Sequence, residues 1–564
     1  MNNKIKGIAL ASFLAAGIGF NSCDLVKDLN YKVVQNPLVL KGDEVKLQIT
    51  GEFIEKGLNK KAVVEITPVF VCKDGTEIPF DTKVFKGEKA AGNGEVVPKG
   101  GHKFSYSSTR EYQPCMEEGQ VIVRLLPKKG DKEKEVITTD PIADGTIITQ
   151  LLVKFDDQVI AAQDQFVRTT SETTAATINY DKAKFNVKSS ELKQQDIKDL
   201  EMFITDAQTN VRRDVKGINI QSYASPEGEV DKNNNLAEDR ATSAETYLTN
   251  FYKKAKFEAA QVSKTPKGED WDGFKTEVEK TTHPDKELIL RVLEMTKDVN
   301  KREEDIRNMA KAYKFLEKDV LPQLRRSQMV VTYDKVGWSD DELKQLSKTK
   351  PDTLTVEELL YTGNLVEDLG EKLRIYKEAQ RMYPNDFRTS NNVGYVLYMQ
   401  NDLEGAKAAF EAANTAESNS TTLNNLGAVN HMMGDQDKAK ELFAQAGTSA
   451  ETNYNLGLIA ITEGNYGEAL EKMGSNQTFN VALAQVLNGD AASAPATIDA
   501  SADADEAHSH YLKAVVAARA NDAAGVVSNL KTAIAKDSMY KAKAARDAEF
   551  IKLRDNADFS ALVK

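Results

Sequence analysis

The sequence is poor in the residue types that build metal and redox centres, with three cysteines and five histidines among 564 residues. No two cysteines have the C-x-x-C spacing of a zinc or dithiol site. His508 and His510 form an H-x-H pair beside two aspartates, but no third ligand follows at a regular spacing. We therefore expect no metal site and no cofactor.

The chain also lacks an excess of positive charge and the common catalytic motifs. Its 74 Lys and Arg residues face 86 Asp and Glu residues, giving a net charge of −12. A nucleic-acid partner is disfavoured, because attraction to phosphates supplies much of such binding. The G-x-S-x-G, H-E-x-x-H and Walker patterns are missing from the sequence. We expect a protein that is not an enzyme.

Long apolar runs are missing as well, apart from one short stretch near the N-terminus. Two lysines precede an apolar run over residues 8–20, which is too short to span a bilayer. The run ends at Ser22-Cys23, a small residue before a cysteine, which resembles a lipoprotein processing site. We interpret residues 1–22 as a signal peptide and Cys23 as the lipidated start of the mature chain. An ordinary secretory signal with an incidental cysteine is the alternative.

Residues 23–130 have the pattern of an antiparallel β-sandwich. Short alternating segments are separated by turn signals such as Asp74-Gly75. The two remaining cysteines, Cys72 and Cys115, are expected to form a disulfide outside the cytoplasm. We expect a spacer or an interaction module here, followed over residues 131–175 by a second small β unit or connector.

The most informative stretch runs from Ile218 to Tyr252. An alternating strand is followed by a turn at Pro226 and Gly228 and then by an amphipathic helix. This stretch resembles the peptidoglycan-associated, OmpA C-terminal-like family, whose motif is N-x-x-L-S-x-x-R-A-x-x-V-x-x-Y-L after a loop glycine. The matching residues are Gly228, Asn233, Leu236, Arg240, Ala241, Ala244, Tyr247 and Leu248. The resemblance covers residues 176–336, with a helical insertion from Phe274 to about Leu321.

This resemblance implies an α/β domain that binds the diaminopimelate residue of a peptidoglycan stem. Arg240 occupies the position of the family arginine that grips the free carboxylate, a role that suits a guanidinium. The family has an aspartate facing the ammonium group of the ligand, and this chain has Ser225 there. We hypothesise that Glu227 supplies the carboxylate instead. The alternative for Arg240 is an exposed helical arginine that pairs with a neighbour such as Glu238.

Three further residues are expected in the same pocket: Tyr223, Asn233 and Arg326. Arg326 belongs to a Leu-Arg-Arg sequence that resembles the family's Asn-Arg-Arg ending before the last strand. A buried tyrosine and an ordinary surface arginine are the alternative interpretations.

After a charged linker over residues 337–355, residues 356–564 have the pattern of helical repeats. Asn392-Val393-Gly394 recurs 33 residues later as Asn425-Leu426-Gly427 and 30 residues after that as Asn455-Leu456-Gly457. These copies resemble tetratricopeptide repeats, which implies an all-α solenoid with a concave groove. Such a groove usually binds a partner protein, and an architectural spacer is the alternative.

Together these patterns predict a multidomain protein with an antiparallel β-sandwich, a central α/β OmpA-like domain and a C-terminal tetratricopeptide solenoid. We expect a non-catalytic lipoprotein of the bacterial outer membrane that faces the periplasm, binds peptidoglycan and recruits a protein partner. One alternative is a structural subunit of an outer-membrane assembly, secretion or surface-fibre machine, in which the OmpA-like domain no longer binds peptidoglycan. Another places the lipoprotein on the cell surface, with Asp24 and Asp28 as an export signal.

Overall fold

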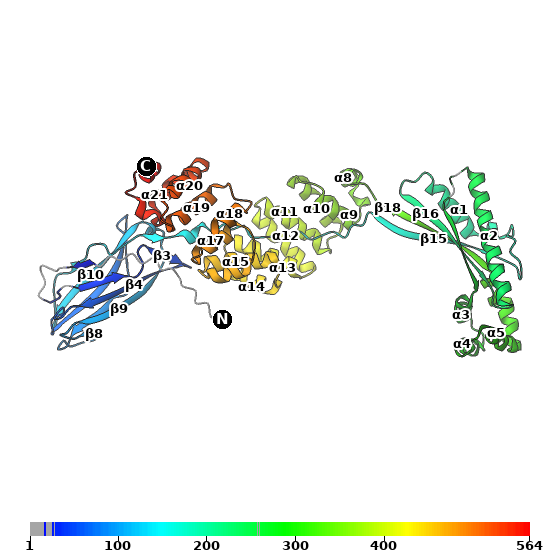
Figure 1. The fold of residues 1–564 in the computed structure, drawn as a ribbon, viewed down its shortest axis with the longest axis horizontal. Helices are drawn as coiled ribbons and strands as arrows, with labels where there is room; N and C mark the ends of the chain where they lie inside the picture. Colours follow the sequence, from blue (N-terminus) through cyan, green and yellow to red (C-terminus); the bar gives the residue numbers. More distant parts are fainter. Residues whose placement is uncertain (1–15, 19–24, 28, 257, 259) are drawn as a thin grey trace. The chain divides into compact units, whose positions relative to one another are not determined.

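The computed structural model describes residues 16–18, 25–27, 29–256, 258 and 260–564 (Figure 1). Cys23 and most of the predicted signal segment lie outside the described residues. The chain divides into two compact units. The first unit combines Met1–Gln163 with Val366–Lys564, and the second comprises Asp164–Leu365.

The N-terminal part of the first unit is rich in β-structure and contains two sheets. One sheet has the order β1 (Ala16–Ile18), β2 (Leu29–Val33), β4 (Glu44–Phe53), β3 (Leu38–Lys41) and β14 (Thr146–Ile147), with β9 (His102–Glu111) on β4. The other has the order β11 (Lys132–Glu133), β10 (Gly119–Lys129), β5 (Ala62–Cys72), β7 (Lys83–Gly87) and β8 (Glu95–Val97). In this sheet β12 (Ile137–Thr138) and β13 (Ala143–Asp144) pair with β10, and β6 (Glu77–Pro79) pairs with β5.

The two sheets share one apolar core, because alternate residues of each strand point inward. In β4 the buried positions include Val45, Leu47 and Ile49, with exposed residues between them. The rings of Phe53 and Phe104 pack on Phe85 with centroid distances of 5.1 and 4.8 Å. A disulfide joins Cys72 at the end of β5 to Cys115 in the 3₁₀ helix η1 (Pro114–Glu117).

The second β unit predicted for residues 131–175 does not exist as a separate body. Strands β11 to β13 extend the sheet of β10, and β14 pairs with β3, so residues 132–147 complete the β module. The 3₁₀ helix η2 (Thr149–Leu152) and an extended segment follow. The strand β15 (Thr169–Asn179) belongs to the second unit, which therefore begins its sheet earlier than residue 176.

The second unit contains a four-stranded sheet with the order β15–β18–β16–β17. Its strands are β15, β16 (Arg213–Ala224), β17 (Val262–Glu269) and β18 (Arg326–Val336), and only β16 and β17 run parallel. The helices α1 (Gln195–Ala207), preceded by η3 (Glu191–Lys193), and α2 (Val230–Ala255) pack on this sheet through a shared core.

The predicted helical insertion is a bundle of short helices with a core of its own. It contains α3 (Trp271–Lys280), α4 (Lys286–Met295), α5 (Val299–Asn308), α6 (Ala310–Phe315), the π-helical η4 (Leu316–Val320) and α7 (Leu321–Leu324). The predicted linker over residues 337–355 is also helical, with α8 (Asp340–Thr349) and η5 (Pro351–Thr353). Ser339 precedes α8 and forms a capping box with Glu342, which explains why a helix begins within this charged sequence. The helix α9 (Val356–Asn364), predicted as part of the solenoid, belongs to the second unit.

The C-terminal part of the first unit is a solenoid of antiparallel helix pairs. Its helices are α10 (Leu369–Met382), α11 (Phe387–Met399), α12 (Leu403–Ala416), α13 (Ser420–Met432), α14 (Gln436–Ala446), α15 (Ala450–Thr462), α16 (Tyr466–Met473), α17 (Phe479–Leu487), α18 (Ala494–Asp499), α19 (Ala507–Arg519), α20 (Ala523–Lys536), α21 (Met539–Arg546), η6 (Ala548–Leu553) and α22 (Ala557–Val563).

The repeated glycines explain how closely the paired helices approach. A Cβ atom added at Gly394 would lie 2.6 Å from the ring of Phe410, and one at Gly427 would lie 2.5 Å from the ring of Phe443. Each glycine therefore leaves the space that the aromatic ring of the following helix fills. The spacing seen in the sequence corresponds to successive helix pairs.

Candidate functional site

Four asparagines line the solenoid at one position of successive helix pairs. Asn392 lies in α11, Asn425 in α13, Asn455 in α15 and Asn480 in α17, and all four side chains are fully buried. A buried amide is costly unless both its donor and its acceptor are satisfied. Their partners come from an extended segment of the same chain, residues 153–163, which we call the strap.

Each asparagine binds the backbone of one strap residue through both its amide atoms. Its Oδ1 accepts the backbone N–H and its Nδ2 donates to the carbonyl oxygen of that same residue. Asn392 contacts Ala162 at 2.8 and 2.9 Å, and Asn425 contacts Ile160 at 2.7 and 2.8 Å. Asn455 contacts Gln158 at 2.7 and 2.9 Å, and Asn480 contacts Lys154 at 2.9 Å in both bonds. The bound residues are separated by even numbers of positions, as an extended chain requires.

A second row of buried asparagines completes the network. Asn391 and Asn424 donate to the carbonyl oxygens of Ile160 and Gln158 at 3.0 and 2.9 Å. Asn425 also donates to Asn391 at 2.9 Å, and Asn455 donates to Asn424 at 3.2 Å. Asn391 also donates to Asn392 and Asn424 donates to Asn425, so five of the six amides form one connected hydrogen-bonded array along the strap. Asn480 donates instead to Lys154, Asp156 and Tyr454.

Side chains of the strap add contacts of greater chemical selectivity. The carboxylate of Asp157 lies 2.8 and 2.9 Å from Nδ1 of His431, and both side chains are buried. Burial raises the pKa of Asp157, while the hydrogen bond with His431 opposes the rise. Asp156 accepts hydrogen bonds from Tyr454 at 2.8 Å and Asn480 at 2.9 Å. Val159 packs against the apolar clusters of two successive repeats.

The strap begins at a polar joint between the β module and the solenoid. The buried Gln150 side chain donates to the carbonyl oxygens of Gly42 and Thr462, both at 2.9 Å. Its Oε1 accepts from the Gly42 amide at 2.9 Å and from Tyr466 at 2.6 Å. One glutamine therefore connects the turn between strands β3 and β4 to helices α15 and α16.

The groove predicted from the repeats is therefore already filled by the chain itself. The sequence interpretation used the Asn-x-Gly triplets only as repeat markers and did not assign the asparagines a role. A signal was present, because an asparagine recurs at a helical position whose neighbours are buried. Such a residue must have a regular polar partner.

In the second unit, Arg240 is fully buried and bonds to the backbone. Its guanidinium donates to the carbonyl oxygens of Lys184 at 3.0 Å, Tyr223 at 2.8 Å and Asp181 at 3.3 Å. Burial lowers the pKa of Arg240 to about 10, so the group stays charged at neutral pH. The alternative of an exposed arginine paired with Glu238 is wrong, because no part of the side chain reaches solvent.

Ser225 and Glu227 lie together, as expected for one pocket, but both bond to other groups of the protein rather than facing an open site. The Ser225 hydroxyl donates to Glu227 at 2.7 Å, and Arg325 contacts the same carboxylate oxygen at 2.7 Å. The other Glu227 oxygen lies 3.1 Å from the ammonium group of Lys182. The chain thus places its own lysine where the hypothesis placed the ammonium group of a ligand. The sequence interpretation missed both Arg325 and Lys182 as partners.

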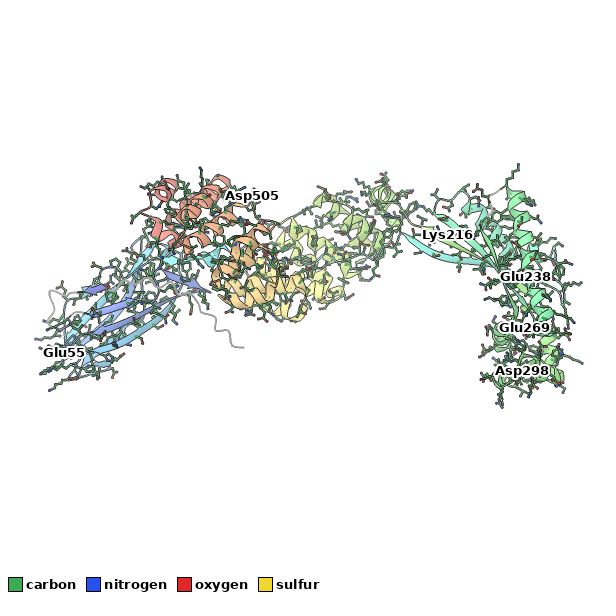
Figure 2. The ribbon with its side chains drawn as sticks, viewed as in Figure 1. Glu55, Lys216, Glu238, Glu269, Asp298 and Asp505 are labelled. Atoms are coloured by element: carbon green, nitrogen blue, oxygen red, sulfur yellow. A yellow bond between two sulfur atoms is a disulfide. The ribbon has the colours of Figure 1, made fainter. Side chains whose placement is uncertain are left out.

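The other three predicted pocket residues, Tyr223, Arg326 and Asn233, lie at a separate concave surface of about 630 Å³. Tyr223 and Arg326 line it, and the guanidinium carbon lies 4.7 Å from the ring centroid. Arg326 also contacts the buried Asp270 at 2.6 Å. Asn233 donates at 2.8 Å to Glu269, which lines the surface and is labelled in Figure 2.

Within the part of the chain that the structure describes, no helix is both long and apolar enough to cross a bilayer. Among these same residues, no group of three or more His, Cys, Asp or Glu side chains could hold a metal ion.

Comparisons with known proteins identify no family. No protein-family model matches the sequence, and no curated protein matches it. Among solved structures, a tetratricopeptide repeat protein from Parabacteroides merdae has 17% identity, covering 42% of this chain and 95% of that one, with a TM-score of 0.29. The pilF protein of Pseudomonas aeruginosa has 16% identity, covering 35% and 94%, with a TM-score of 0.28.

The APC/C complex Cut9–Hcn1 has 14% identity, covering 40% of this chain and 45% of that one, with a TM-score of 0.31. The present chain thus spans less than half the length of that protein. At such scores the likenesses carry no argument about function. The chain's own helix pairs and their 30- and 33-residue spacing define its repeat architecture.

Proposed function

We propose that this protein is a non-catalytic scaffold of the bacterial cell envelope whose solenoid binds an extended segment of a partner protein. The observation that carries the proposal is the array of six buried asparagines, which recognises the backbone of an extended chain. Backbone recognition of this kind gives affinity, while a few side-chain contacts give selectivity. The strap shows the binding mode that a partner segment would use.

The envelope part of the proposal is supported by the sequence. The apolar run before Cys23 and the small residue at Ser22 support a lipid anchor at the outer membrane, with the protein facing the periplasm. Labelling with radioactive palmitate should mark the parent chain and leave the Cys23→Ala variant unmarked. Equal labelling of both chains would remove the anchor from the proposal.

Within this scaffold the second unit serves a structural role, as in a subunit of an outer-membrane assembly. Its Arg240 and Glu227 already have partners in the segment 181–184, where Arg240 contacts two carbonyl oxygens and Glu227 contacts Lys182. A carboxylate ligand would have to replace three carbonyl oxygens around a buried guanidinium. This arrangement favours a structural unit over one that grips peptidoglycan through Arg240.

Site-specific photo-cross-linking tests the scaffold function. A benzophenone amino acid replaces Tyr398 of α11, whose hydroxyl donates to the Asp157 carbonyl oxygen of the strap at 3.0 Å, in the full chain produced by the encoding bacterium. We expect a protein adduct from this position and none from a matched probe at the exposed Met295. The adduct should disappear when Asn425→Asp is added. An adduct that forms equally at both positions, or at neither, would contradict the proposal.

Peptidoglycan contact at the concave surface beside Arg326 is the second candidate function. The observation in its favour is that both signs of charge line this surface, with Lys267, Lys280 and Arg326 facing Asp272 and Glu277. Such a surface suits the zwitterionic diaminopimelate group of a stem peptide. The full chain should then co-sediment with diaminopimelate-type peptidoglycan and lose this property in Arg326→Ala but not in Arg291→Ala, an exposed control. A parent chain that stays in the supernatant would eliminate this function.

A further inference from the structure

We infer that the groove of helices α11 to α17 selects partner segments with the pattern Asp-Asp-x-Val, and that the strap is an internal occupant which such a segment displaces. This inference rests on the proposed scaffold function and specifies its ligand. The strap carries the pattern as Asp156-Asp157-Gln158-Val159. Three features of its contacts lead to this conclusion.

The first feature is that the main-chain contacts accept a segment from another chain. Apart from the bond from Asn480 to the Asp156 carboxylate, the asparagines bind only N–H and C=O groups of the strap, which every residue except proline offers. They impose an extended conformation and exclude proline at the positions of Lys154, Gln158, Ile160 and Ala162. They do not require that the segment belong to the same polypeptide.

The second feature is that three side chains of the strap reach selective partners. Asp157 is buried against His431, and burial of a carboxylate demands such a partner. Asp156 accepts from Tyr454 and Asn480, whose hydroxyl and amide donors match a carboxylate oxygen. Val159 fills the space between the apolar clusters of two repeats. A segment without these groups would leave polar atoms of the groove unpaired.

The third feature is that the strap can leave without dismantling the rest of the first unit. Gln150 and Thr149 hold the joint between the β module and the solenoid, and both precede the strap. Phe155 keeps half of its surface exposed to solvent, so part of the strap's apolar surface stays unburied in the groove. A tethered occupant competes at an effective concentration on the order of millimolar, which a better-fitting partner segment can exceed.

The test measures binding of a labelled peptide to the full chain. A fluorescein-labelled peptide with the sequence VKFDDQVIAAQ, residues 153–163, is titrated with the parent and with a strap variant carrying Asp157→Ser and Val159→Ser. We expect the strap variant to bind at least tenfold more tightly than the parent, because its own strap competes less well. A peptide with serine at the same two positions should bind the strap variant at least tenfold more weakly.

Adding His431→Ala to the strap variant should remove the preference for the parent peptide over a peptide that has serine at position 157 alone, because only this contact involves His431. A folded strap variant that binds both peptides equally, or neither, would overturn the inference. The proposed function would still stand in that case if the cross-linked adduct at Tyr398 forms. An adduct that fails to form while the peptides bind as expected would instead contradict the proposed function.

Hydrogen–deuterium exchange of the parent chain provides a second measurement in case the strap variant loses its helical circular dichroism. Millimolar strap peptide should accelerate exchange at the Ile160 amide of the chain by at least tenfold, because the displaced strap loses its bond to Asn425. The serine-substituted peptide serves as the control. Unchanged exchange with both peptides would overturn the inference.

Discussion

Removal of a single asparagine from the array should release the strap locally. Asn425 supplies the acceptor for the Ile160 N–H, one of the two donors to the Ile160 carbonyl oxygen and the donor to Asn391. In Asn425→Ala the carbonyl oxygen keeps its bond from Asn391, whereas the N–H of Ile160 and the Oδ1 of Asn391 lose these partners. Each buried polar group without a partner costs about 1–3 kcal/mol, so for these two groups we expect a loss of about 2–6 kcal/mol.

Amide exchange is the suitable assay, because a chain with two units does not unfold in a single two-state transition. With about 1.4 kcal/mol for each factor of ten, the protection of the Ile160 amide should fall by at least about 30-fold, and by about 10⁴-fold at the upper end of this range. In the parent, the amides of Lys154, Gln158, Ile160 and Ala162 should exchange slowly. Those of Val159 and Ala161 donate to no protein atom within the described part of the chain and should exchange faster.

Two further variants make this prediction refutable. Asn425→Asp keeps the acceptor but places a carboxylate oxygen against the oxygens of Ile160 and Asn391, so the destabilisation should be larger at pH 7 than at pH 4. Asn488→Ala removes an exposed asparagine at the end of α17 and should change local stability by less than about 0.5 kcal/mol. Parent-like protection of Ile160 in Asn425→Ala, or equal losses in Asn488→Ala, would refute the reasoning.

Three other changes have defined outcomes. Burial, with a smaller effect from Glu549, raises the pKa of Asp547 to about 6, so its folded form favours the proton. Protonation of Asp547 therefore contributes about 3 kcal/mol to the free energy of unfolding below about pH 4, and this contribution is lost as the pH rises through about 6. Asp547→Asn should remove this decline from urea-unfolding midpoints followed between pH 4 and 7, and an unchanged slope would contradict the assignment. Gly427→Ala places a Cβ atom 2.5 Å from the ring of Phe443 and should cost about 1–3 kcal/mol, with recovery when Phe443→Leu is added. Arg240→Met keeps much of the side-chain volume but leaves three carbonyl oxygens without this donor. The free energy of unfolding of the second unit, measured by thermal unfolding, should therefore fall by about 3–5 kcal/mol. The same substitution at the exposed Arg291 should leave it unchanged.

The sequence predicted elements whose pattern is local. Alternation identified the strands around Val45 and Ile218, and the glycine-containing repeats identified the paired helices of the solenoid. The helix after Gly228 was also expected, although it begins at Val230 rather than at Leu236. These features depend on residues that lie within a few positions of one another, so periodicity reveals them.

The strap could not be predicted in this way, because its partners lie far away in the sequence. Ile160 and Lys154 bond to asparagines that are 265 and 326 residues distant. The strap also shows no alternation of apolar and polar residues. Its backbone bonds to side chains of the solenoid rather than to another strand, so the groove determines which of its residues are buried. The apolar residues after Ile147 therefore resembled a further small β unit, although they belong to the joint and the strap.

Both ligand sites inferred from the sequence contain segments of the chain itself, and the physical difference between them decides which one can receive a partner. In the second unit, Arg240 is held from three directions by carbonyl oxygens, and Tyr180 fixes the adjoining segment through bonds to Arg325, Ser327 and the Arg240 carbonyl oxygen. Opening that site would expose a buried charge and break the core polar network at once. The strap instead rests on separate, repeated contacts to its backbone, which another extended segment can reproduce one residue at a time. We therefore expect partner exchange at the solenoid, and we expect any wall contact at the open surface beside Arg326 rather than at Arg240.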